Sequence, residues 1–223
     1  MTLLKINQAI ATIAGNQVLR QVTVDIAAGE TLALIGRNGA GKTSLLRTIM
    51  GALPLVKGEI LFNGQNINIL AAHERVKMGI GYAPEERRLI GKFTVKENIL
   101  LPAWASNLTA SEIKHRLELI YSVAPELEGL SPRLGGLLSG GQQKMVALGR
   151  ALMAGKHIVL LDEPFQGLAP ALAHKYADML RALRNAQPDL AILVTESNPL
   201  LLKAMADRMI TLERGEIQSE ISS

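Results

Sequence analysis

The sequence predicts a layered α/β domain with a mainly parallel core sheet. Short apolar runs alternate along the chain with longer stretches of helical periodicity, which is the pattern of strands that are separated by crossover helices. One apolar run leads directly into a glycine-rich turn, and a helical pattern follows that turn. The chain has 223 residues, of which 48% are hydrophobic and 20% charged, so it can bury a substantial core.

The apolar runs mark the expected strands of the parallel sheet. In chain order they are residues 32–35, 59–62, 80–83, 158–161, 192–195 and 209–212. A helix is expected over residues 42–50. The first thirty residues alternate apolar and polar positions, as Val22, Val24 and Ile26 illustrate, which indicates antiparallel strands at an edge.

The middle of the chain, residues 87–150, is predicted to be a mostly helical insertion. Thr94 stands three residues before Glu97, and Thr109 stands three residues before Glu112. This spacing is that of a capping box, which marks the start of a helix. No repeat or flexible linker separates the parts, so we expect one domain over 1–223, with a core from 1–86 and 151–223 and a helical subdomain from 87–150.

Composition excludes several classes of function. The chain has no cysteine, hence no disulfide framework, and its formal charge of +4 is scattered rather than clustered. Aromatic residues make up only 3%, so no nucleic-acid partner is expected. We expect no signal peptide and no membrane span, since no stretch approaches ~20 apolar residues. The four histidines (His73, His115, His157 and His174) lack paired metal-ligand spacing.

The glycine-rich turn has the form of a phosphate-binding loop. Gly36 is followed at the P-loop spacing by Gly41, Lys42 and Thr43, with a predicted strand before and a helix after. The glycines allow backbone N–H groups to surround phosphate oxygens, and the helix adds the positive end of its dipole. Lys42 supplies a charge to the β- and γ-phosphates, and the Thr43 hydroxyl is a natural ligand for Mg²⁺.

Two acids end the apolar run that begins near Val159. Asp162, at the carboxyl end of the predicted strand, is placed to hold Mg²⁺ directly or through water. Glu163 would then lie near the γ-phosphate and polarise the attacking water. Farther upstream, Leu138-Ser-Gly-Gly-Gln142 precedes a helical pattern over 143–153, which makes a second anion site. A second anion site ~100 residues from the first is explained if it reaches a nucleotide across an interface.

These three motifs together resemble the ABC-type ATPases over nearly the whole chain. The resemblance implies a P-loop NTPase fold with a mainly parallel core sheet, an antiparallel edge subdomain and a helical subdomain. It also implies head-to-tail dimers that hold ATP and Mg²⁺ between the P-loop of one copy and the signature segment of the other. Glu163 would be the catalytic acid, and Thr43, Glu85 and Asp162 would meet the metal. The nucleotide-binding residues would be Gly36, Arg37, Asn38, Gly39, Ala40, Gly41, Lys42, Thr43 and Ser44, with Ser139, Gly140, Gly141 and Gln142 acting on the partner's nucleotide.

Finer motifs look most like the shorter ATPase subunit of branched-chain amino acid and urea importers. They are Tyr82-Ala-Pro-Glu85-Glu-Arg-Arg, Thr94-Val-Lys-Glu-Asn98, Arg150-Ala-Leu-Met and the segment 162–170; the Pro-Glu-Glu-Arg-Arg stretch is also similar to sugar importers. The resemblance implies an ATPase that energises a membrane importer for branched-chain or hydrophobic amino acids or related small polar solutes. Its partners would be a second ATPase subunit (a homo- or heterodimer), two permease subunits and an extracytoplasmic solute-binding protein. The chain would lie on the cytoplasmic face of the inner or plasma membrane.

Two segments carry the expected coupling to the permease. Residues 82–92 would link the nucleotide to the permease, and the apolar surface at 93–104, which includes Trp104, either receives a permease helix or packs the subdomain.

The chain departs from the usual family pattern at four positions. Glu85 stands in place of a glutamine, and Ala169 in place of an aspartate, both as in the closer subfamily. Ser197 stands at the switch histidine, or Glu196 if a gap is allowed, so slow turnover is our hypothesis. Ile13 stands where an aromatic residue usually stacks on adenine, which predicts weak nucleotide discrimination.

Two other functions compete with the importer hypothesis. The chain could be a catalytically weak ATP-binding partner in a heterodimeric transporter, as Ser197 and Ile13 suggest. It could also be a soluble ABC protein that acts on DNA or ribosomes, although the sequence has none of the coiled coils, zinc modules or tandem ATPase units typical of that class. An Asn-Lys-x-Asp base-reading motif is absent from the sequence, which disfavours a GTPase switch.

Overall fold

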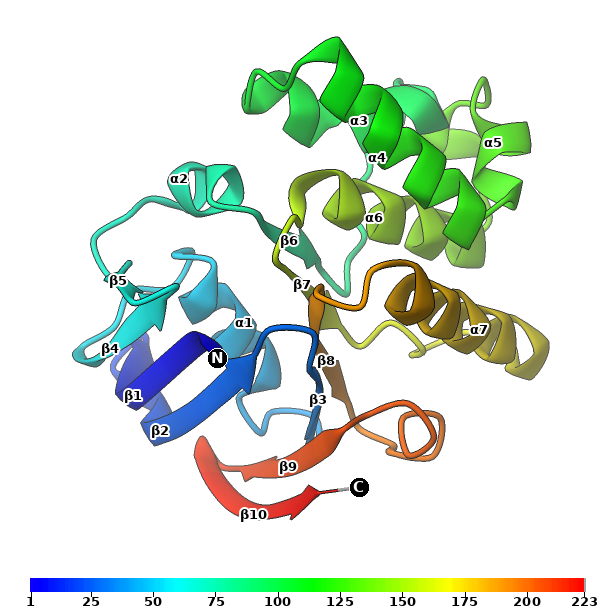
Figure 1. Ribbon diagram of the computed structural model, residues 1–223. Coiled ribbons are helices and arrows are strands. Elements are labelled where there is room, and N and C mark those ends of the chain that lie inside the picture. The colour runs from blue at the N-terminus through cyan, green and yellow to red at the C-terminus, as the bar shows by residue number, and fades with distance from the viewer. Residues whose placement is uncertain (223) are drawn as a thin grey trace.

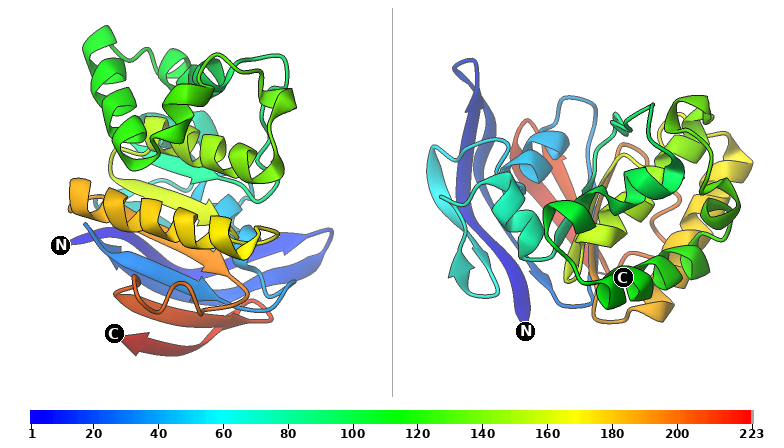
Figure 2. Two further views of the ribbon diagram at one scale, coloured as in Figure 1. Left: turned by 90° about the vertical axis from the view of Figure 1, so that its right-hand side faces the viewer. Right: turned by 90° about the horizontal axis from the view of Figure 1, so that it is seen from above.

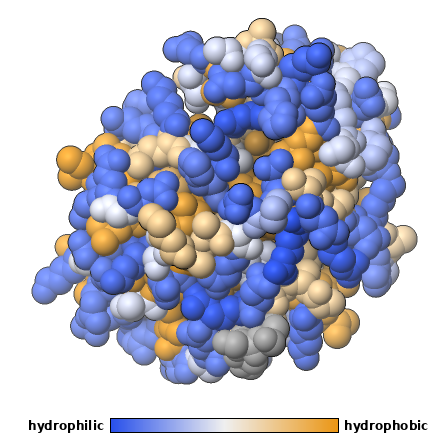
Figure 3. All heavy atoms as spheres, in the orientation of Figure 1, coloured by the Kyte–Doolittle hydropathy of each residue, from blue (hydrophilic) through white to orange (hydrophobic). Residues whose placement is uncertain are grey.

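The computed structural model describes residues 1–222, which form two sheets with helix α1 between them and further helices outside (Figure 1, Figure 2). The helices are α1 (Lys42–Ile49), α2 (Ala72–Lys77), α3 (Val95–Ala105), α4 (Ala110–Val123), α5 (Glu126–Leu130), α6 (Gly140–Ala154) and α7 (Pro170–Ala186), with a 3₁₀ turn at Gly135–Leu137. Hydrophilic side chains cover most of the face in Figure 3, and hydrophobic ones gather in small patches.

The core sheet has six strands in the order β10-β9-β3-β8-β7-β6. Their bounds are β3 (Thr31–Ile35), β6 (Ile80–Ala83), β7 (Ile158–Asp162), β8 (Ala191–Glu196), β9 (Arg208–Glu213) and β10 (Glu216–Ser222). All pairs are parallel except β9 with β10. The predicted parallel core is therefore confirmed, and β10 adds an antiparallel strand at its edge.

The second sheet is antiparallel throughout and has the order β2-β1-β4-β5. Its strands are β1 (Thr2–Ile13), β2 (Asn16–Ala27), β4 (Lys57–Phe62) and β5 (Gln65–Asn66). The antiparallel edge predicted from the first thirty residues is confirmed by β1 and β2.

The prediction that residues 59–62 belong to the parallel sheet was wrong. These residues lie in β4, which pairs with β1 in the antiparallel sheet. Asn63 and Gly64 follow β4 with φ values of +50° and +77°, and they join it to β5 in a hairpin. An Asn-Gly pair with both φ angles positive is a hairpin turn, and a hairpin makes an antiparallel neighbour.

The core strands separate two hydrophobic cores. Along β7, Ile158 and Leu160 point into a core shared with α1 and the antiparallel sheet, whereas Val159 and Leu161 point into a core shared with α6 and α7. Successive side chains of a strand face opposite sides of a sheet, so a strand buried on both faces is apolar throughout. This arrangement holds the carboxyl ends of β3, β7 and β8 in one place.

Helices α3 to α6 gather above α7 in the view of Figure 1, and α6 and α7 share the core on one face of the parallel sheet. The capping boxes predicted at Thr94 and Thr109 are confirmed, because each hydroxyl accepts the N–H three residues on. Helix α6 is fixed at its carboxyl end. A Cβ added at Gly81 of β6 would lie 2.1 Å from the backbone oxygen of Ala151, so the helix and strand backbones touch there.

Candidate nucleotide-binding and hydrolysis site

A cavity of about 440 Å³ opens where β3 and β7 end and α1 begins. It is lined by the P-loop and the start of α1, by residues of the turn that follows β7, by one acid that follows β6, and by one residue of β2. The lining residues are Val18, Asn38, Gly39, Gly41, Lys42, Thr43, Ser44, Glu85, Glu163 and Gln166. The structure thus brings Glu85 and Glu163 to the P-loop, although they lie far from it in sequence.

The P-loop leaves the first turn of α1 open. Gly41 takes the position before the helix with φ +111°, and it provides no side-chain cap. The first N–H groups of a helix need partners from outside it, and here they are free to meet phosphate oxygens. At Gly36 a Cβ would lie 2.4 Å from the Leu212 carbonyl oxygen, so the start of the loop requires glycine.

Lys42 is buried, with 3% of its surface exposed, and it points along the P-loop. Its ammonium donates to the carbonyl oxygen of Gly36 at 2.6 Å and forms an ion pair with Glu163 Oε1 at 2.9 Å. It also lies 3.3 Å from Ser197 Oγ. Because Glu163 and Ser197 both contact Lys42, the structure joins the P-loop cation to the two predicted catalytic residues.

Asp162 is held by three hydroxyl groups from three elements. Thr43 Oγ1 and Thr195 Oγ1 donate to its Oδ1 at 3.1 and 3.0 Å, and Tyr82 donates to its Oδ2 at 3.1 Å. Burial raises the pKa of Asp162, and the three hydrogen bonds oppose that rise. The Asp162 carboxylate raises the pKa of Tyr82 in turn, after the larger effect of burial.

The pair of Thr43 and Asp162 fits a magnesium ion. Mg²⁺ prefers oxygen ligands and is usually held by one or two carboxylates together with phosphates and waters. The Thr43 hydroxyl and the Asp162 carboxylate lie side by side at the foot of the P-loop, and the Glu85 carboxylate lines the same cavity.

Glu163 occupies an unusual backbone conformation. Its φ is +46°, a region that residues other than glycine rarely adopt, and its side chain is buried. Its N–H donates to the backbone oxygen of Thr195 at 3.1 Å. One carboxylate oxygen pairs with Lys42, and the other, Oε2, is buried without a hydrogen-bond partner. That oxygen is free to accept a proton from a water that enters the cavity.

Ser197 and Glu196 follow β8 and take different places. The Ser197 hydroxyl donates to Asn38 Oδ1 at 3.0 Å, and Glu163 Oε1, at 3.4 Å, is an alternative acceptor, so Ser197 lies within the site. Glu196 is buried beside it and accepts the N–H of Phe165 at 2.8 Å. Burial raises the pKa of Glu196 to about 7, and the Glu163 charge adds to that rise.

The signature segment lies outside this cavity. Ser139 is the N-cap of α6 and forms a capping box with Gln142, and Gly140 and Ser139 are exposed to solvent. Ser139, Gly140, Gly141 and Gln142 are not among the residues that line the P-loop cavity. Within one chain, the structure does not bring the two predicted anion sites together.

Ile13 also lies outside the cavity. It ends β1 with 44% of its surface exposed, and the side chain that lines the cavity from this sheet is Val18. The turn at Ala14 and Gly15, both with positive φ, separates the two residues. Val18, like Thr195 and Gln166, was not singled out in the sequence. Thr195 had a usable signal, because it is a polar residue at the end of a predicted core strand.

Its P-loop, its buried aspartate and the adjoining glutamate define a P-loop nucleoside triphosphatase. The chain belongs to the ABC transporter family, whose pattern it matches over residues 19–166. It is an ABC-type ATPase and an ATP-binding subunit of a transporter, as the family's members are. ABC ATPases bind ATP, generally with Mg²⁺, and their homologues work as dimers with membrane permeases. None of the helices within residues 1–222 has the length and apolar character needed to cross a bilayer.

The similar proteins are named for the transport of different substances. The chain is 32% identical to the high-affinity branched-chain amino acid transport ATP-binding protein BraG of Pseudomonas aeruginosa, over 90% of this chain and 84% of the relative. It is also 32% identical to LivF of Archaeoglobus fulgidus, a probable branched-chain amino acid transport ATP-binding protein, over the same shares. It is 30% identical to the lipopolysaccharide export system ATP-binding protein LptB of Escherichia coli K12, over 91% of this chain and 83% of the relative.

The fold is also similar to that of solved ATP-binding cassettes. A dimeric ATP-binding cassette in a post-hydrolysis state, bound to ADP and Pi, superposes with a TM-score of 0.84 at 26% identity, covering 99% of this chain and 98% of the other.

Proposed function

We propose that this chain hydrolyses ATP to energise a membrane importer, and that it does so in head-to-tail pairs of ATPase subunits. The observation that carries the proposal is the separation of two anion sites. Lys42 and Glu163 line the P-loop cavity, with Asp162 bonded to Thr43 beside it, whereas the Ser139–Gln142 turn faces solvent elsewhere on the chain. A second ATPase subunit, turned head to tail, would place its own turn against the nucleotide that this P-loop binds.

In the proposed hydrolysis reaction, a few residues of this cavity have separate roles. The open first turn of α1 and Lys42 bind and orient the phosphates. Thr43 and Asp162 would hold Mg²⁺, which supplies charge neutralisation at the phosphates when bound. Glu163 positions a water for attack on the γ-phosphorus. The water oxygen bonds to phosphorus, the bond to the ADP oxygen breaks, and the products are ADP and inorganic phosphate.

The segment from Tyr82 to Lys92 is placed to couple this site to a permease. Tyr82 bonds to Asp162, and Glu85 lines the nucleotide cavity. On its other side, the same segment contributes Tyr82 and Arg88 to a groove of about 360 Å³. The floor of the groove is largely apolar, and its lining residues are Arg47, Met50, Ala52, Val76, Tyr82, Pro84, Arg88, Pro102, Arg150 and Ala154. Its arginines suit a permease loop that carries carboxylates at its ends.

For the solute, we propose branched-chain or related hydrophobic amino acids. The relatives BraG and LivF support this choice by their names and by their 32% identity. LptB, named for lipopolysaccharide export, is nearly as similar, so the solute must be tested directly. Localisation at the cytoplasmic face of the membrane, with a solute-binding protein outside, belongs to the same proposal.

The hydrolysis part of the proposal is tested with E163Q. The amide keeps the size of the side chain but cannot accept a proton, so we expect kcat to fall at least 100-fold on the scale of general-base catalysis. ATP binding, measured by isothermal titration, should remain. A kcat for E163Q within a few-fold of the parent chain would remove Glu163 from the reaction.

The transport part is tested in the native cell. The tagged chain is purified from gently solubilised membranes, and its partners are identified by mass spectrometry. Recovery of permeases, a second ATPase and an amino-acid-binding protein, with loss of leucine uptake on deletion, supports the importer. Recovery of lipopolysaccharide export components, or of ribosomal proteins alone, contradicts it.

A second candidate, a catalytically weak ATP-binding partner in a heterodimer, is favoured by Ser197. Its hydroxyl contacts Lys42 and Glu163, but it does not carry the titrating ring of a histidine. If the weak site is real, S197H should raise single-turnover hydrolysis in the assembled complex. Hydrolysis by the parent chain that equals that of a histidine-bearing relative would contradict this candidate.

A further inference from the structure

Lys144 is a buried cation that has no role in the reaction described above. Lys144 lies in the second turn of α6, just after the signature segment, and only 6% of its surface is exposed. Its neighbours in the helix, Met145 and Val146, are buried apolar residues. Burying an ammonium group is costly unless it is paired and hydrogen-bonded.

The partner of Lys144 is the backbone of the predicted catalytic glutamate. Its ammonium donates to the carbonyl oxygen of Glu163 at 2.6 Å, and this hydrogen bond is buried. The Glu163 carbonyl oxygen also accepts the N–H of Gln166, at 3.3 Å. Burial lowers the pKa of Lys144, and the Arg87 charge adds to that effect, whereas the carboxylates of Glu196, Glu85 and Glu163 oppose it.

The peptide units around Glu163 are therefore held from two sides. On the amino side, its N–H is bonded to Thr195 of β8, and on the carboxyl side its carbonyl is bonded to Lys144 of α6. Two residues farther along the chain, the N–H of Phe165 is bonded to Glu196. A positive φ at a residue other than glycine costs free energy and persists only where its surroundings fix it. The direction of the Glu163 carboxylate depends on this backbone conformation.

We propose that Lys144 is a positioning residue that fixes the backbone of Glu163 and ties it to the signature helix of the same chain. The inference rests on the proposed function, because in a head-to-tail dimer the two ends of this link serve different nucleotides. Glu163 acts on the nucleotide of its own P-loop, whereas the signature turn at Ser139 acts on the partner's nucleotide. Lys144 then connects the two hydrolysis sites of the dimer.

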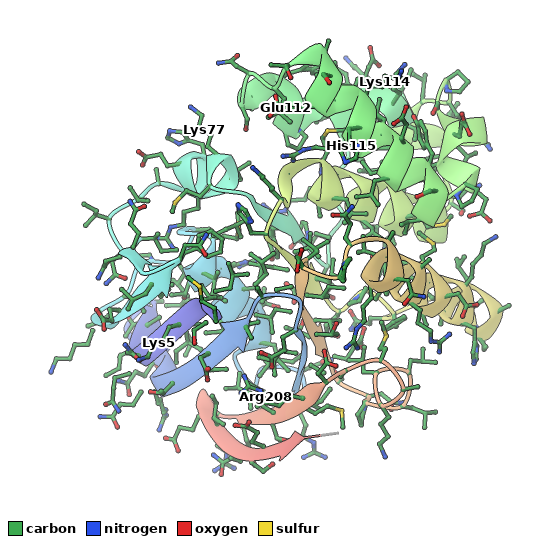
Figure 4. All side chains as sticks on the ribbon, in the orientation of Figure 1. Lys5, Lys77, Glu112, Lys114, His115 and Arg208 are labelled. Atoms are coloured by element: carbon green, nitrogen blue, oxygen red, sulfur yellow. The ribbon has the colours of Figure 1, made fainter. Side chains whose placement is uncertain are left out.

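The first test compares K144M, K144R and a surface control, K114M, by steady-state hydrolysis and thermal melting. Lys114 lies on the outer face of α4 with its side chain 79% exposed, so its replacement leaves the core unchanged (Figure 4). For K144M we expect kcat to fall at least tenfold with the KM for ATP within twofold of the parent, because binding does not use Lys144. K144R keeps a cationic donor and should recover much of the lost kcat.

Three results would overturn the positioning role. They are an unchanged kcat in K144M, a rise in KM that matches the fall in kcat, and a K144R variant as slow as K144M. A parent chain that neither binds nor hydrolyses ATP would remove the proposed function, and the inference with it. If the parent chain hydrolyses ATP and K144M has the same kcat, the proposed function stands and only the positioning role of Lys144 is contradicted.

The second test asks which site each residue serves, with mixed dimers purified through two different tags. A K144M chain paired with an S139R chain carries both defects at one nucleotide site, so about half of the activity should remain. A chain with both substitutions, paired with a parent chain, carries one defect at each site and should be nearly inactive. E163Q in place of K144M should give the same two results. The reverse pattern would place Lys144 at the partner's nucleotide and overturn the proposed link.

Discussion

Helices α1 and α6 both begin at glycine-rich turns of the kind that bind phosphate, yet only α6 has a side-chain cap at its amino end. Gly41 leaves the start of α1 without a side-chain cap, inside a cavity. Ser139 and Gln142 cap the start of α6 reciprocally, on the surface. The first turn of α1 is thus ready for an anion inside the cavity, whereas the first turn of α6 lies on the surface and its Gln142 N–H already bonds to the Ser139 hydroxyl. The difference agrees with the proposed head-to-tail pairing, in which the first turn of α1 binds the chain's own nucleotide and the first turn of α6 meets that of the partner.

The largest expected effect is on the open turn. In K42M, the cavity loses a charged donor to phosphate, worth about 1.5–3 kcal/mol, so ATP affinity should weaken roughly 10- to 100-fold. Titration calorimetry with ATP measures this loss. K5M, at an exposed position on β1, is the control and should bind normally (Figure 4). Equal affinities for K42M and the control would show that α1 does not hold the phosphates.

The next effect separates capping from ligand binding at α6. S139A and T109A each remove an N-cap hydroxyl whose hydrogen bond to the third residue on spans 3.3 Å. Both should lose about 1 kcal/mol of stability in denaturant unfolding. Only S139A should also lower kcat, because Thr109 starts a helix without a signature. Parallel losses of kcat in both variants would reduce the role of Ser139 to capping.

A smaller effect is expected at the buried carboxyl behind the P-loop. The pKa of Glu196 is raised by burial from 4.5 to about 7, so folding disfavours its charged form. Stability from this group is retained below pH 4.5, declines as pH rises toward 7, and stays low above it. E196Q keeps an oxygen for the Phe165 N–H and does not titrate. Its melting temperature should therefore exceed that of the parent by a few degrees at pH 8 and by less at pH 5. A difference that does not change with pH would contradict this.

The smallest effect concerns the choice of base. Val18 lines the nucleotide cavity, and Ile13 lies outside it, so the described residues offer an aliphatic surface at that end. Such a surface lacks the stacking energy of about 1–3 kcal/mol that an aromatic ring gives a base. ATP and GTP should then bind within a few-fold of each other in paired titrations. A GTP affinity many-fold weaker than that for ATP would contradict the expectation.

Sequence patterns predicted best those parts of the structure that depend on residues close together in the chain. The P-loop, the strand that ends in Asp162 and the capping boxes of α3 and α4 each depend on a few neighbouring residues, and the fold follows them. The parallel sheet followed from the apolar runs, because strands that are buried on both faces are apolar throughout.

Other features depend on contacts between distant segments. An apolar run does not specify its sheet, which is why β4 was assigned to the wrong one, although Asn63-Gly64 signalled the hairpin. The outward position of Ile13 follows from the turn at Ala14 and Gly15. Lys144 shows the same limit. A lysine in a helix is usually solvated, and only the packing of α6 against β6 and β7 brings its ammonium to the Glu163 carbonyl.

The contact between Gly81 and Ala151 has a consequence for how far the signature turn can travel. It fixes the carboxyl end of α6 to the core sheet, together with Gly155, where a Cβ would lie 2.4 Å from Val159. Ser139 and Gly140, at the amino end, are exposed to solvent, and the next turn is bonded to Glu163 through Lys144. Fifteen helical residues span about 22 Å, so a rotation of about 5° about the carboxyl end, in which the Glu163 turn follows the helix, displaces the amino end by about 2 Å. An angular change too small to disturb the core is thus large enough to make or break a hydrogen bond at Ser139.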